Sequence, residues 1–579
     1  PALTDYFGGD TLTYLETARE IAKLHLLFNE AGIREGDKIA LIGRNNIRWC
    51  VTYIATITYG AVIVPILQDF NPADMMNIIN HSESRMLFIG DNFMANLDPA
   101  RMPALEAIFS LTDFSLTYDR DKPRIKRAVK SAYKTFYRTY GKKFGVDDIK
   151  YRDVPNDRII LLNYTSGTTG SSKGVMLTVN NLTGNVIFAA SVVEPSTGKP
   201  YFDKGGRTLS FLPLAHAYGC AFDFLTQLAV GAHITLLGRI PSPKILVEAM
   251  QNVRPTIICS VPLVLEKVYR KQIMPMLEKG PMSIAMKIPL LNTALYSIIR
   301  SKMMASFGGQ LKIFIVGGAP MNQETEAFLL KIKFPITVGY GMTECAPLIS
   351  FTTDDLFKAG SCGMYIKEYL DLRIDSPDPE HTAGEIIVKG EHVMLGYYKE
   401  PELTAEAFDQ DGYLHTGDIG HLEDGFLYIT DRKKELFKTS GGKYITPQPI
   451  ENALMQSRYI DQAMVVGNGK EHPSVILEPD FGELALWCEQ RGIPTGDRTA
   501  MTSDEQVLAL YKSLVHEVNK SLSNWERLRH FRLVADQWTT EGGELTPTLK
   551  IKRRRLTEKY AGLIADIYQE DLLENERQD

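Results

Sequence analysis

The stretch YTSGTTGSSKGV, residues 164–175, decides the fold of the chain and is its most informative segment. The apolar run RIILLN before it, residues 158–163, predicts a buried strand. A strand that leads into a loop rich in Gly, Ser and Thr presents N–H and hydroxyl groups to an anion, most often a phosphate. The groups that can contribute are Thr165, Ser166, Gly167, Thr168, Thr169, Gly170 and Lys173.

The spacing of this loop differs from that of the ordinary phosphate loop, GxxxxGK[ST]. Lys173 is neither preceded by glycine nor followed by Ser or Thr, so the segment predicts a phosphate loop of another kind. The same mismatch excludes an ordinary phosphate-loop NTPase. A flexible, solvated linker is the alternative interpretation, although such linkers seldom follow a buried strand.

The composition is that of an ordinary soluble globular protein of two or more domains: 579 residues, 44% hydrophobic and 23% charged. The net charge of −6 argues against a nucleic-acid partner. Six cysteines without a CxxC pair favour a reducing compartment over disulfides or a zinc site. No apolar run reaches the ~18 residues that span a bilayer. We expect a cytoplasmic protein and leave open a peripheral position at the inner membrane surface.

Helix and strand patterns alternate along most of the chain, which predicts α/β layers with parallel strands. The predicted elements of the first set are a strand at 39–42, a helix at 49–59 and a strand at 61–66; a second set has strands at 208–212, 234–237, 256–260, 312–316 and 335–338. Beyond residue 360, short alternating strands at 384–390 and 413–429 predict a β subdomain. The charged run at 430–435 indicates a domain boundary.

Residues 120–143 depart from this order, with ten lysines and arginines and a single acid, Asp121. Apolar and aromatic residues recur at helical spacing on one side: Ile125, Val129, Tyr133, Phe136 and Tyr140. A basic amphipathic helix with aromatics is typical of a membrane-surface element. A solvated basic face that covers a neighbouring subdomain explains the pattern equally well, and both interpretations stay open.

Four further segments follow the loop in order: LPLAHAYG at 212–219, VGYGMTE at 338–344, YLHTGDIG at 413–420 and YITDRKKELFKTSGGKYITPQPIE at 428–451. With the loop they resemble the signature set of the AMP-forming adenylating enzymes, over nearly the whole chain. GGAP at 317–320, LPLAH at 212–216 and LTPTLKIKR at 545–553 are most similar to the long-chain fatty acyl-CoA synthetases.

The resemblance implies a multi-domain α/β fold. A large N-terminal domain, residues 1–432, would hold two α/β subdomains and a distorted β-barrel; a small, mobile α+β domain, residues 433–579, would cap it. It also implies a reaction in two halves: a fatty acid carboxylate attacks ATP to give acyl-AMP and pyrophosphate, and CoA then displaces AMP. ATP, Mg²⁺ and CoA are the expected cofactors and co-substrates.

Site roles follow from the same resemblance. Tyr340, flanked by Gly339 and Gly341, is expected to stack on adenine, with Gly317 and Gly318 allowing close approach. Thr343 is expected to reach the α-phosphate, and Glu344 with Thr165 to bind Mg²⁺. Asp418 is expected to accept the ribose hydroxyls, and Arg432 to contact the ribose or a phosphate. The residues 218–224 and 260–263, apolar or small, are expected in an acyl tunnel or in plain core.

His216 is expected near the substrate carboxylate, against the alternative of a buried core histidine. Lys550 is the expected catalytic lysine; Leu549 precedes it where relatives have Gly, so Lys552 stays an alternative. Lys434 is expected at a hinge between two domain orientations. Gly441, Gly442 and Lys443 are expected to meet the pantetheine arm of CoA.

Other functions stay open. The acid could be medium-chain, branched or of bile type, and the acceptor could be a carrier protein. A non-catalytic lipid-binding relative is a more distant alternative, against which Lys173, Glu344, Asp418 and Lys550 together argue. The oligomeric state is undetermined, with a homodimer as one option.

Overall fold

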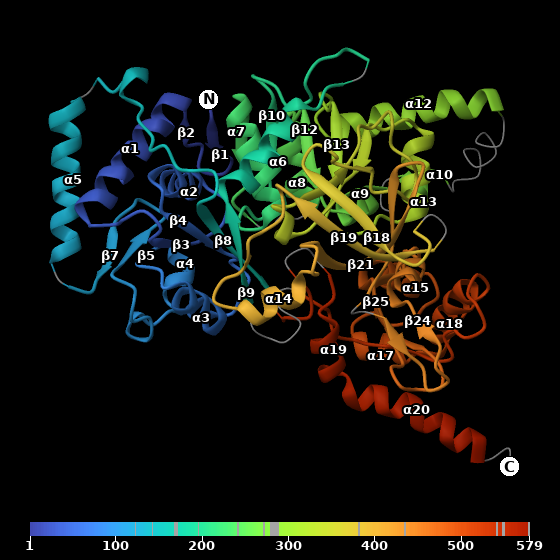
Figure 1. The fold of residues 1–579 in the computed structure, drawn as a ribbon. Coiled ribbons are helices and arrows are strands. Elements are labelled where there is room, and N and C mark those ends of the chain that lie inside the picture. The colour runs from blue at the N-terminus through green and yellow to red at the C-terminus, as the bar shows by residue number, and fades with distance from the viewer. Residues whose placement is uncertain are drawn as a thin grey trace.

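The computed structural model describes residues 1–121, 123–141, 143–166, 172–194, 196–239, 243–269, 273–277, 289–379, 382–433, 436–539, 542–546 and 550–576. A large N-terminal domain carries three extended sheets, and a smaller C-terminal domain follows at the lower right of Figure 1. The predicted α/β multi-domain class is confirmed.

The first sheet has eight strands in the order β20-β9-β8-β4-β3-β5-β6-β7. Their bounds are β3 Lys38–Ile42, β4 Val62–Ile66, β5 Met86–Ile89, β6 Ala107–Ser110, β7 Leu116–Asp119, β8 Ile159–Ser166, β9 Ser172–Thr178 and β20 Gly396–Tyr397. The strands from β8 to β6 are parallel, whereas β7, β9 and β20 add antiparallel edges. The central strands are buried on both faces, which explains their continuous apolar runs.

The second sheet has seven strands in the order β14-β13-β12-β10-β11-β1-β2. Their bounds are β1 Leu3–Asp5, β2 Thr11–Leu12, β10 Arg207–Ser210, β11 His233–Leu236, β12 Ile257–Ser260, β13 Ile313–Val316 and β14 Ile336–Val338. All neighbours pair in parallel except β1 and β2. The five strands predicted for the second set are confirmed within a few residues at each end.

Helices cover and separate these two sheets. Their bounds are α1 Tyr14–Glu30, α2 Ile47–Tyr59, α3 Pro72–Ser82, α4 Asp91–Met94, α5 Arg124–Tyr140, α6 Val179–Ser191, a π-helix Gly219–Leu225, α7 Thr226–Val230, α8 Pro243–Val253, α9 Pro262–Val268, α10 Met274–Leu277, α12 Pro289–Ser306 and α13 Gln323–Lys331. Helix α2 is apolar on most sides because it lies in the core that the two sheets share. There Trp49 and Tyr53 pack edge-on against Phe224 of the π-helix.

The third sheet is antiparallel and takes the place predicted for the distorted β-barrel, with β15 and β18 as its edges. Its strands in spatial order are β15 Tyr340–Gly341, β16 Leu348–Phe351, β17 Met364–Tyr365, β22 Phe426–Arg432, β21 Leu414–Glu423, β19 Gly384–Gly390 and β18 Leu370–Asp375. The short helix α14, Pro401–Ala407, packs beside β20 and β21.

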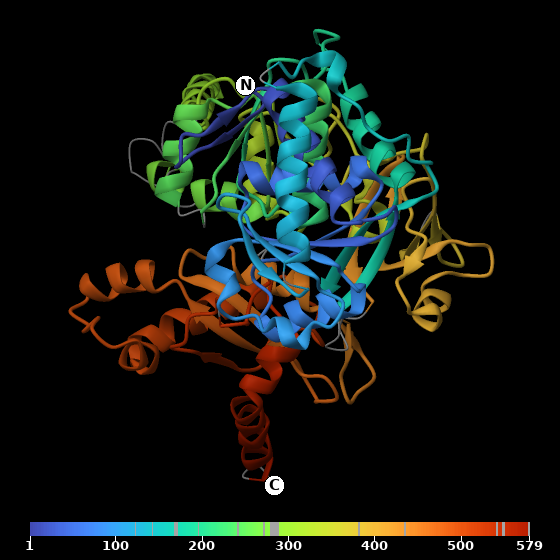
Figure 2. The same cartoon turned by 90° about the vertical axis from the view of Figure 1, so that its left-hand side faces the viewer.

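The C-terminal domain has its own hydrophobic core, built on a three-stranded sheet. Its elements are β23 Phe437–Lys438, β24 Tyr444–Ile445, α15 Pro447–Leu454, β25 Ile460–Val466, β26 Ser474–Pro479, α16 Phe481–Glu489, α17 Arg498–Ser503, α18 Glu505–Asn519, β27 Phe531–Leu533, α19 Arg553–Lys559 and α20 Ala561–Glu576. Helix α20 projects away from the rest of the molecule in Figures 1 and 2.

The basic helix expected within residues 120–143 is α5, which packs along α1. Its buried side is formed by Ile125, Ala128, Ala132 and Phe136. Tyr133 lies at the margin of the predicted apolar side, outside the contact with α1, and is 63% exposed. In the described part of the chain, no helix is long and apolar enough to cross a membrane.

Candidate active site

Strands β8 and β9 form a hairpin that carries the residues at both ends of the phosphate-loop motif. Thr165 pairs with Lys173 and Ser166 with Ser172, so both hydroxyl residues stand in the strand rather than in the predicted loop. The antiparallel ladder continues to the end of β8, which is why the strand is longer than its apolar run. Gly167, Thr168, Thr169 and Gly170 lie outside the described residues.

Tyr397 connects two of the predicted site residues. Its hydroxyl donates a 2.9 Å hydrogen bond to Oε1 of Glu344, and its ring lies 5.0 Å from the ammonium nitrogen of Lys173. Tyr397 belongs to β20, which pairs with β9 beside Lys173. Strand pairing therefore holds the carboxylate of Glu344 next to the hairpin.

Asp418 is buried at the junction of β21 and β22, where two donors meet it. The hydroxyl of Tyr340 donates to Oδ2 at 2.7 Å, and Nε of Arg432 donates to Oδ1 at 2.8 Å. The sequence motifs that supply these three residues are far apart in the chain, and the third sheet brings them together.

Glu385 fixes the loop that precedes Asp418. It accepts hydrogen bonds from Lys433 at 2.7 Å and the N–H of Gly417 at 3.0 Å, and its Oε2 lies 3.0 Å from Nδ1 of His415. Burial raises the pKa of Glu385, but the bonds from Lys433 and His415 outweigh burial and leave the pKa below its ordinary value. The carboxylate is therefore ionised, and it holds His415 and Gly417 of β21 close to Lys433.

An apolar cavity, partly open to solvent, lies beside Tyr340. Its lining includes seven of the predicted site residues, namely His216, Gly317, Gly318, Gly339, Tyr340, Gly341 and Thr343. From the predicted acyl tunnel, Tyr218 and Phe222 also line it. Val261, Pro262 and Leu263 do not; they line a second cavity. Helix α6 contributes Phe188 and Ala189 to the wall.

Glycine is required at some positions of this cavity by the backbone conformation and at others by the lack of room for a side chain. Gly318 has a φ of +82°, a conformation that side chains disfavour. A Cβ on Gly341 would lie 2.1 Å from the carbonyl oxygen of Pro347, so close packing alone requires glycine there. A Cβ on Gly317 would press on the ring of Tyr218.

His216 faces the cavity as a neutral imidazole. Burial, with a smaller contribution from the nearby Lys550 cation, lowers its pKa to about 4. Its Nδ1 accepts from the N–H of Tyr218 at 3.4 Å, so Nε2 carries the proton and serves as a donor.

A second cavity, partly open to solvent, lies between the two domains. Val261, Leu263, Ala319 and Pro320 line it on one side, and Glu451, Asp461, Lys550 and Arg553 on the other. Lys267 and Asp461 form an ion pair of 4.0 Å across it. Lys550 lines this second cavity together with Ala319, which follows the glycines of the first cavity, and it is near enough to His216 to affect the pKa of that residue. Lys552 immediately precedes α19 and lies outside the lining of both cavities.

Two family models match this chain, one in each of the two domains that border the second cavity. The family model for the AMP-binding enzyme matches residues 1–398, and that for the AMP-binding enzyme C-terminal domain matches residues 435–572. The chain belongs to the AMP-binding enzyme family. The predicted resemblance to adenylating enzymes is thereby confirmed.

Two curated relatives of this family member are long-chain-fatty-acid–CoA ligase FadD15 of Mycobacterium bovis and the peroxisomal long chain acyl-CoA synthetase 6 of Arabidopsis thaliana. The first is 29% identical, over 97% of this chain and 92% of its own; the second is 30% identical, over 93% and 79%. A solved A domain of the carboxylic acid reductase from Segniliparus rugosus, in complex with AMP and a co-purified carboxylic acid, has a TM-score of 0.75 at 22% identity and covers 98% of this chain and 92% of its own. The structural likeness shows the fold.

The C-terminal residues of the predicted site are only partly placed in this AMP-binding enzyme. Gly441, Gly442 and Lys443 form the turn between β23 and β24, outside the lining of both cavities. There the Lys443 ammonium lies 5.3 Å from the ring of Trp525. Lys434 lies outside the described residues.

The donor set around Glu344 fits a magnesium ion. One carboxylate of Glu344 and the hydroxyl of Thr165 are hard oxygen ligands, and Mg²⁺ takes few ligands from protein, filling the rest from phosphate and water. Among the described residues, no group of three or more His, Cys, Asp or Glu side chains could hold a metal ion.

Three parts of the site were not predicted: Tyr397, Glu385 and the α6 wall. Tyr397 lies in the segment LGYYKEP. Its two adjacent tyrosines, followed by Lys-Glu-Pro, were the one sequence feature that could have pointed to a site residue here. The sequence of helix α6 carried no such signal, because residues that face a cavity and residues that face the core recur at the same helical spacing. Its buried Asn181 donates to the carbonyl oxygens of Glu391 and Val393, and its Asn185 accepts from the N–H of Leu348.

Proposed function

We propose that this AMP-binding enzyme uses ATP to activate a long-chain fatty acid and transfers the acyl group to CoA, releasing AMP and pyrophosphate. The observation that carries the proposal is the apolar cavity that opens directly beside Tyr340, Thr343 and His216. An apolar cavity with few polar groups at one end suits an alkyl chain with a single carboxylate. The curated relatives, which are named as long-chain acid ligases, support this choice of acid.

In the first half-reaction a carboxylate oxygen attacks the α-phosphorus of ATP, and the bond to pyrophosphate breaks. Tyr340 is the proposed adenine platform, and Asp418 with Arg432 the proposed ribose contact. The phosphates would bind along Thr165, Ser166, Gly167, Thr168, Thr169, Gly170 and Lys173. Thr343, at the mouth of the cavity, would donate to the α-phosphate.

Glu344 and Thr165 would hold Mg²⁺, whose chemistry there is to neutralise phosphate charge. Tyr397 holds Oε1 of Glu344 in a hydrogen bond and leaves Oε2 outside that bond. The protein thereby orients the carboxylate before any ligand arrives.

His216 and Lys550 are the proposed partners of the substrate carboxylate. His216 is neutral and offers an Nε2 proton to an oxygen of the carboxylate or of the α-phosphate. Lys550 supplies the cation that an attack of one anion on another requires.

In the second half-reaction the thiol sulfur of CoA attacks the acyl carbon, and AMP leaves with the bonding electrons. We propose that the C-terminal domain, residues 433–579, then turns about Lys434 and presents Gly441, Gly442 and Lys443 to the pantetheine arm. In the orientation described, these residues lie away from the cavity.

The test is ATP–pyrophosphate exchange across acids from acetate to oleate, followed by addition of CoA. Exchange that peaks with the long acids and yields thioester on adding CoA is expected. Exchange without thioester formation would mean that the acceptor is not CoA but another molecule, such as a carrier protein. A peak at medium-chain, branched or bile-type acids would replace the acid, and no exchange with any acid would contradict catalysis altogether.

A further inference from the structure

Helix α5 forms an outer edge of the N-terminal domain. It stands at the far left of Figure 1, away from the C-terminal domain, and faces the viewer in Figure 2. Its inner side is the contact with α1 through Ile125, Ala128, Ala132 and Phe136. The candidate active site makes no use of the opposite side.

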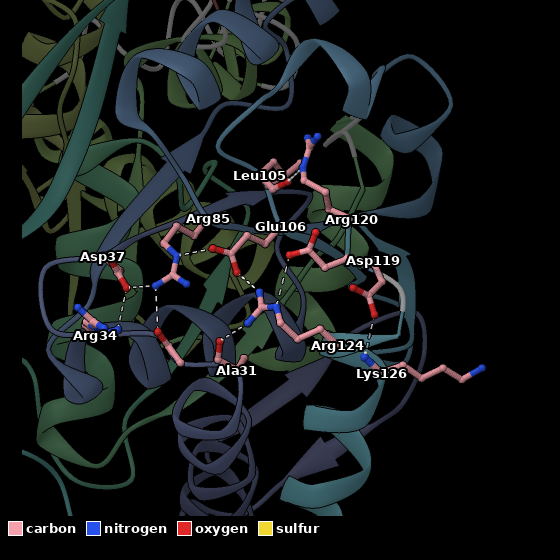
Figure 3. Close-up of polar contacts among 12 residues, drawn as sticks. Ala31, Arg34, Asp37, Arg85, Leu105, Glu106, Asp119, Arg120, Arg124 and Lys126 are labelled. Carbon is pink, nitrogen blue, oxygen red and sulfur yellow. Dashed lines mark hydrogen bonds and ion pairs between the residues drawn. The ribbon is translucent and has the colours of Figure 1, made fainter.

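An ion-pair network anchors the first turn of α5 (Figure 3). Glu106 pairs with Arg124 of the helix and, at 2.7 Å, with Arg85, which also pairs with Asp37. Arg124 further donates to the carbonyl oxygen of Ala31, at the end of α1. Arg124 is therefore neutralised on the inner side and is not part of the outer charge.

The outer side is different in kind. It consists of Lys126, Arg127, Lys130, Tyr133, Lys134, Tyr137 and Arg138, all exposed, and is called the basic face of α5 below. At about 100° per residue, these seven side chains fall within an arc of about 140°. Figure 3 shows Lys126 directed away from the anchoring network. No ion pair joins these five cations to any residue that the structure describes.

This charge arrangement disfavours the helix itself. Lys126, Lys130, Lys134 and Arg138 follow one another at four-residue spacing, and like charges at that spacing repel. Lys126 and Arg127 also lie near the N-terminus, where the helix dipole disfavours cations. The carboxylate of Asp119, which accepts from the N–H of Lys126 at 3.0 Å, offsets this only locally. Helix stability thus gives no reason for the cations.

We propose that the basic face of α5 binds the surface of an anionic lipid bilayer. Charge complementarity supports the assignment, because an all-cationic helix face on a chain of net charge −6 is a localised attraction for a surface of negative charge. The rigid anchoring of α5 would transmit that attraction to the whole N-terminal domain.

The two tyrosines favour lipid over nucleic acid. Tyr133 and Tyr137, 63% and 39% exposed, lie one turn apart with ring centroids 4.6 Å from each other, in the same arc as Lys126 and Lys130. Aromatic rings with a polar tip reside at the headgroup level of a bilayer, with cations beside them reaching the phosphates. A net negative protein gives nucleic acid no further contact beyond this one helix.

The test is co-sedimentation of the full chain with vesicles of equal parts phosphatidylcholine and phosphatidylglycerol. The variant Lys126→Gln/Lys130→Gln/Lys134→Gln should bind about 100-fold more weakly. The matched control, Lys244→Gln/Arg300→Gln/Lys331→Gln, removes the same charge from exposed positions on α8, α12 and α13 and should bind as the unchanged protein does. Binding should also fall as salt is raised.

A reporter locates the contact. Tryptophan introduced as Tyr133→Trp should shift its emission to the blue on these vesicles and be quenched by brominated lipid, whereas Leu486→Trp, exposed on α16, should not. Spectra of the unchanged protein correct for its four native tryptophans. Equal binding by both triple variants, or no response at position 133, would overturn the proposal.

Binding to a DNA oligonucleotide as tight as to the vesicles would likewise overturn the assignment to lipid. The vesicle assay requires no substrate, so its outcome is independent of the proposed reaction. If the protein activates fatty acids but does not bind the vesicles, only the proposed membrane contact is refuted.

Discussion

The hydroxyl of Tyr397 donates a 2.9 Å hydrogen bond to Oε1 of Glu344, while the ring of the same residue lies 5.0 Å from the ammonium nitrogen of Lys173. Burial and the neighbouring Glu344 raise the pKa of Tyr397, so its hydroxyl keeps its proton and remains a donor. One side chain thus aligns the proposed magnesium ligand and the proposed phosphate cation.

Replacing Tyr397 with Phe should lower kcat/KM for ATP about tenfold or more at limiting Mg²⁺, because a hydrogen bond to a charged group contributes ~1.5–3 kcal/mol. Pyrophosphate exchange as a function of Mg²⁺ measures it, and saturating Mg²⁺ should restore part of the loss. Tyr398→Phe is the matched control, since Tyr398 contacts Glu83 on the exposed side. Equal effects of the two changes would contradict the positioning role.

Replacing Lys550 with Ala should abolish adenylation, a loss of a hundredfold or more, and spare thioester formation from supplied acyl-AMP. The reason is its position in the lining of the second cavity, close enough to His216 to lower the pKa of that residue. Separate assays of the two half-reactions decide it. Lys552→Ala, immediately before α19, should leave both halves unchanged; the reverse result would transfer the role to Lys552.

His216 should give no titration step in the activity profile between pH 5.5 and 8, because its pKa is about 4. The depressed pKa also affects stability. The unfolded chain binds a proton near pH 6.5 and the folded site does not, so the contribution present above pH 6.5 is lost toward pH 4, by roughly 3 kcal/mol. His216→Gln should flatten this part of the pH dependence of thermal unfolding, and an unchanged slope would contradict a buried neutral imidazole.

Asp223 lies wholly buried on the π-helix, and neither of its carboxylate oxygens has a hydrogen-bond partner among the described residues. Burial raises the pKa of Asp223 well above 3.8, so its contribution to stability is lost as the pH rises above 3.8 toward the folded value. Asp223→Asn should therefore stabilise the protein more at pH 8 than at pH 5, as measured by thermal unfolding. Destabilisation that is equal at both pH values would mean that the carboxyl makes a specific contact.

Filling the cavity should change the preferred acid. Ala189 on α6 is buried and lines the cavity, so Ala189→Phe should move the optimum of pyrophosphate exchange toward shorter acids by several carbons. Ile187→Phe, on the exposed side of the same helix, is the control and should leave the optimum where it was. A shift with both variants would place the acyl chain elsewhere.

The sequence motifs pointed to proposed ligand-binding residues, but not to the residues that hold them in position. Motifs of fixed order pointed to Tyr340, Glu344 and Asp418; Tyr340 lines the first cavity and donates to Asp418, and Glu344 accepts from Tyr397. Glu385 and Tyr397 act through other residues, and such contacts leave no pattern in a single chain. The pattern of apolar residues in α5 did not show that Ala128 and Ala132 would form the buried contact while Tyr133 stays exposed.

The extent of β8 and the wall of the first cavity could not be predicted for a related reason. Pairing with β9 extends β8 through polar residues that a hydrophobic run does not mark. Residues of a cavity wall are as apolar as those of a filled core, so Val261 and Leu263 could not be distinguished from Phe188 and Ala189 before the packing was known.

Thr178 ends β9 and, through its side chain, caps α6, so the hairpin that carries Lys173 and the helix that walls the cavity form one uninterrupted segment. Asn185 ties that segment to Leu348, near Glu344. Enzyme engineers who widen or narrow the cavity at α6 will therefore move the nucleotide hairpin as well. Variants selected for a new acid should therefore also show a changed KM for ATP. Restoring that KM calls for second-site substitutions along β9 rather than in the cavity.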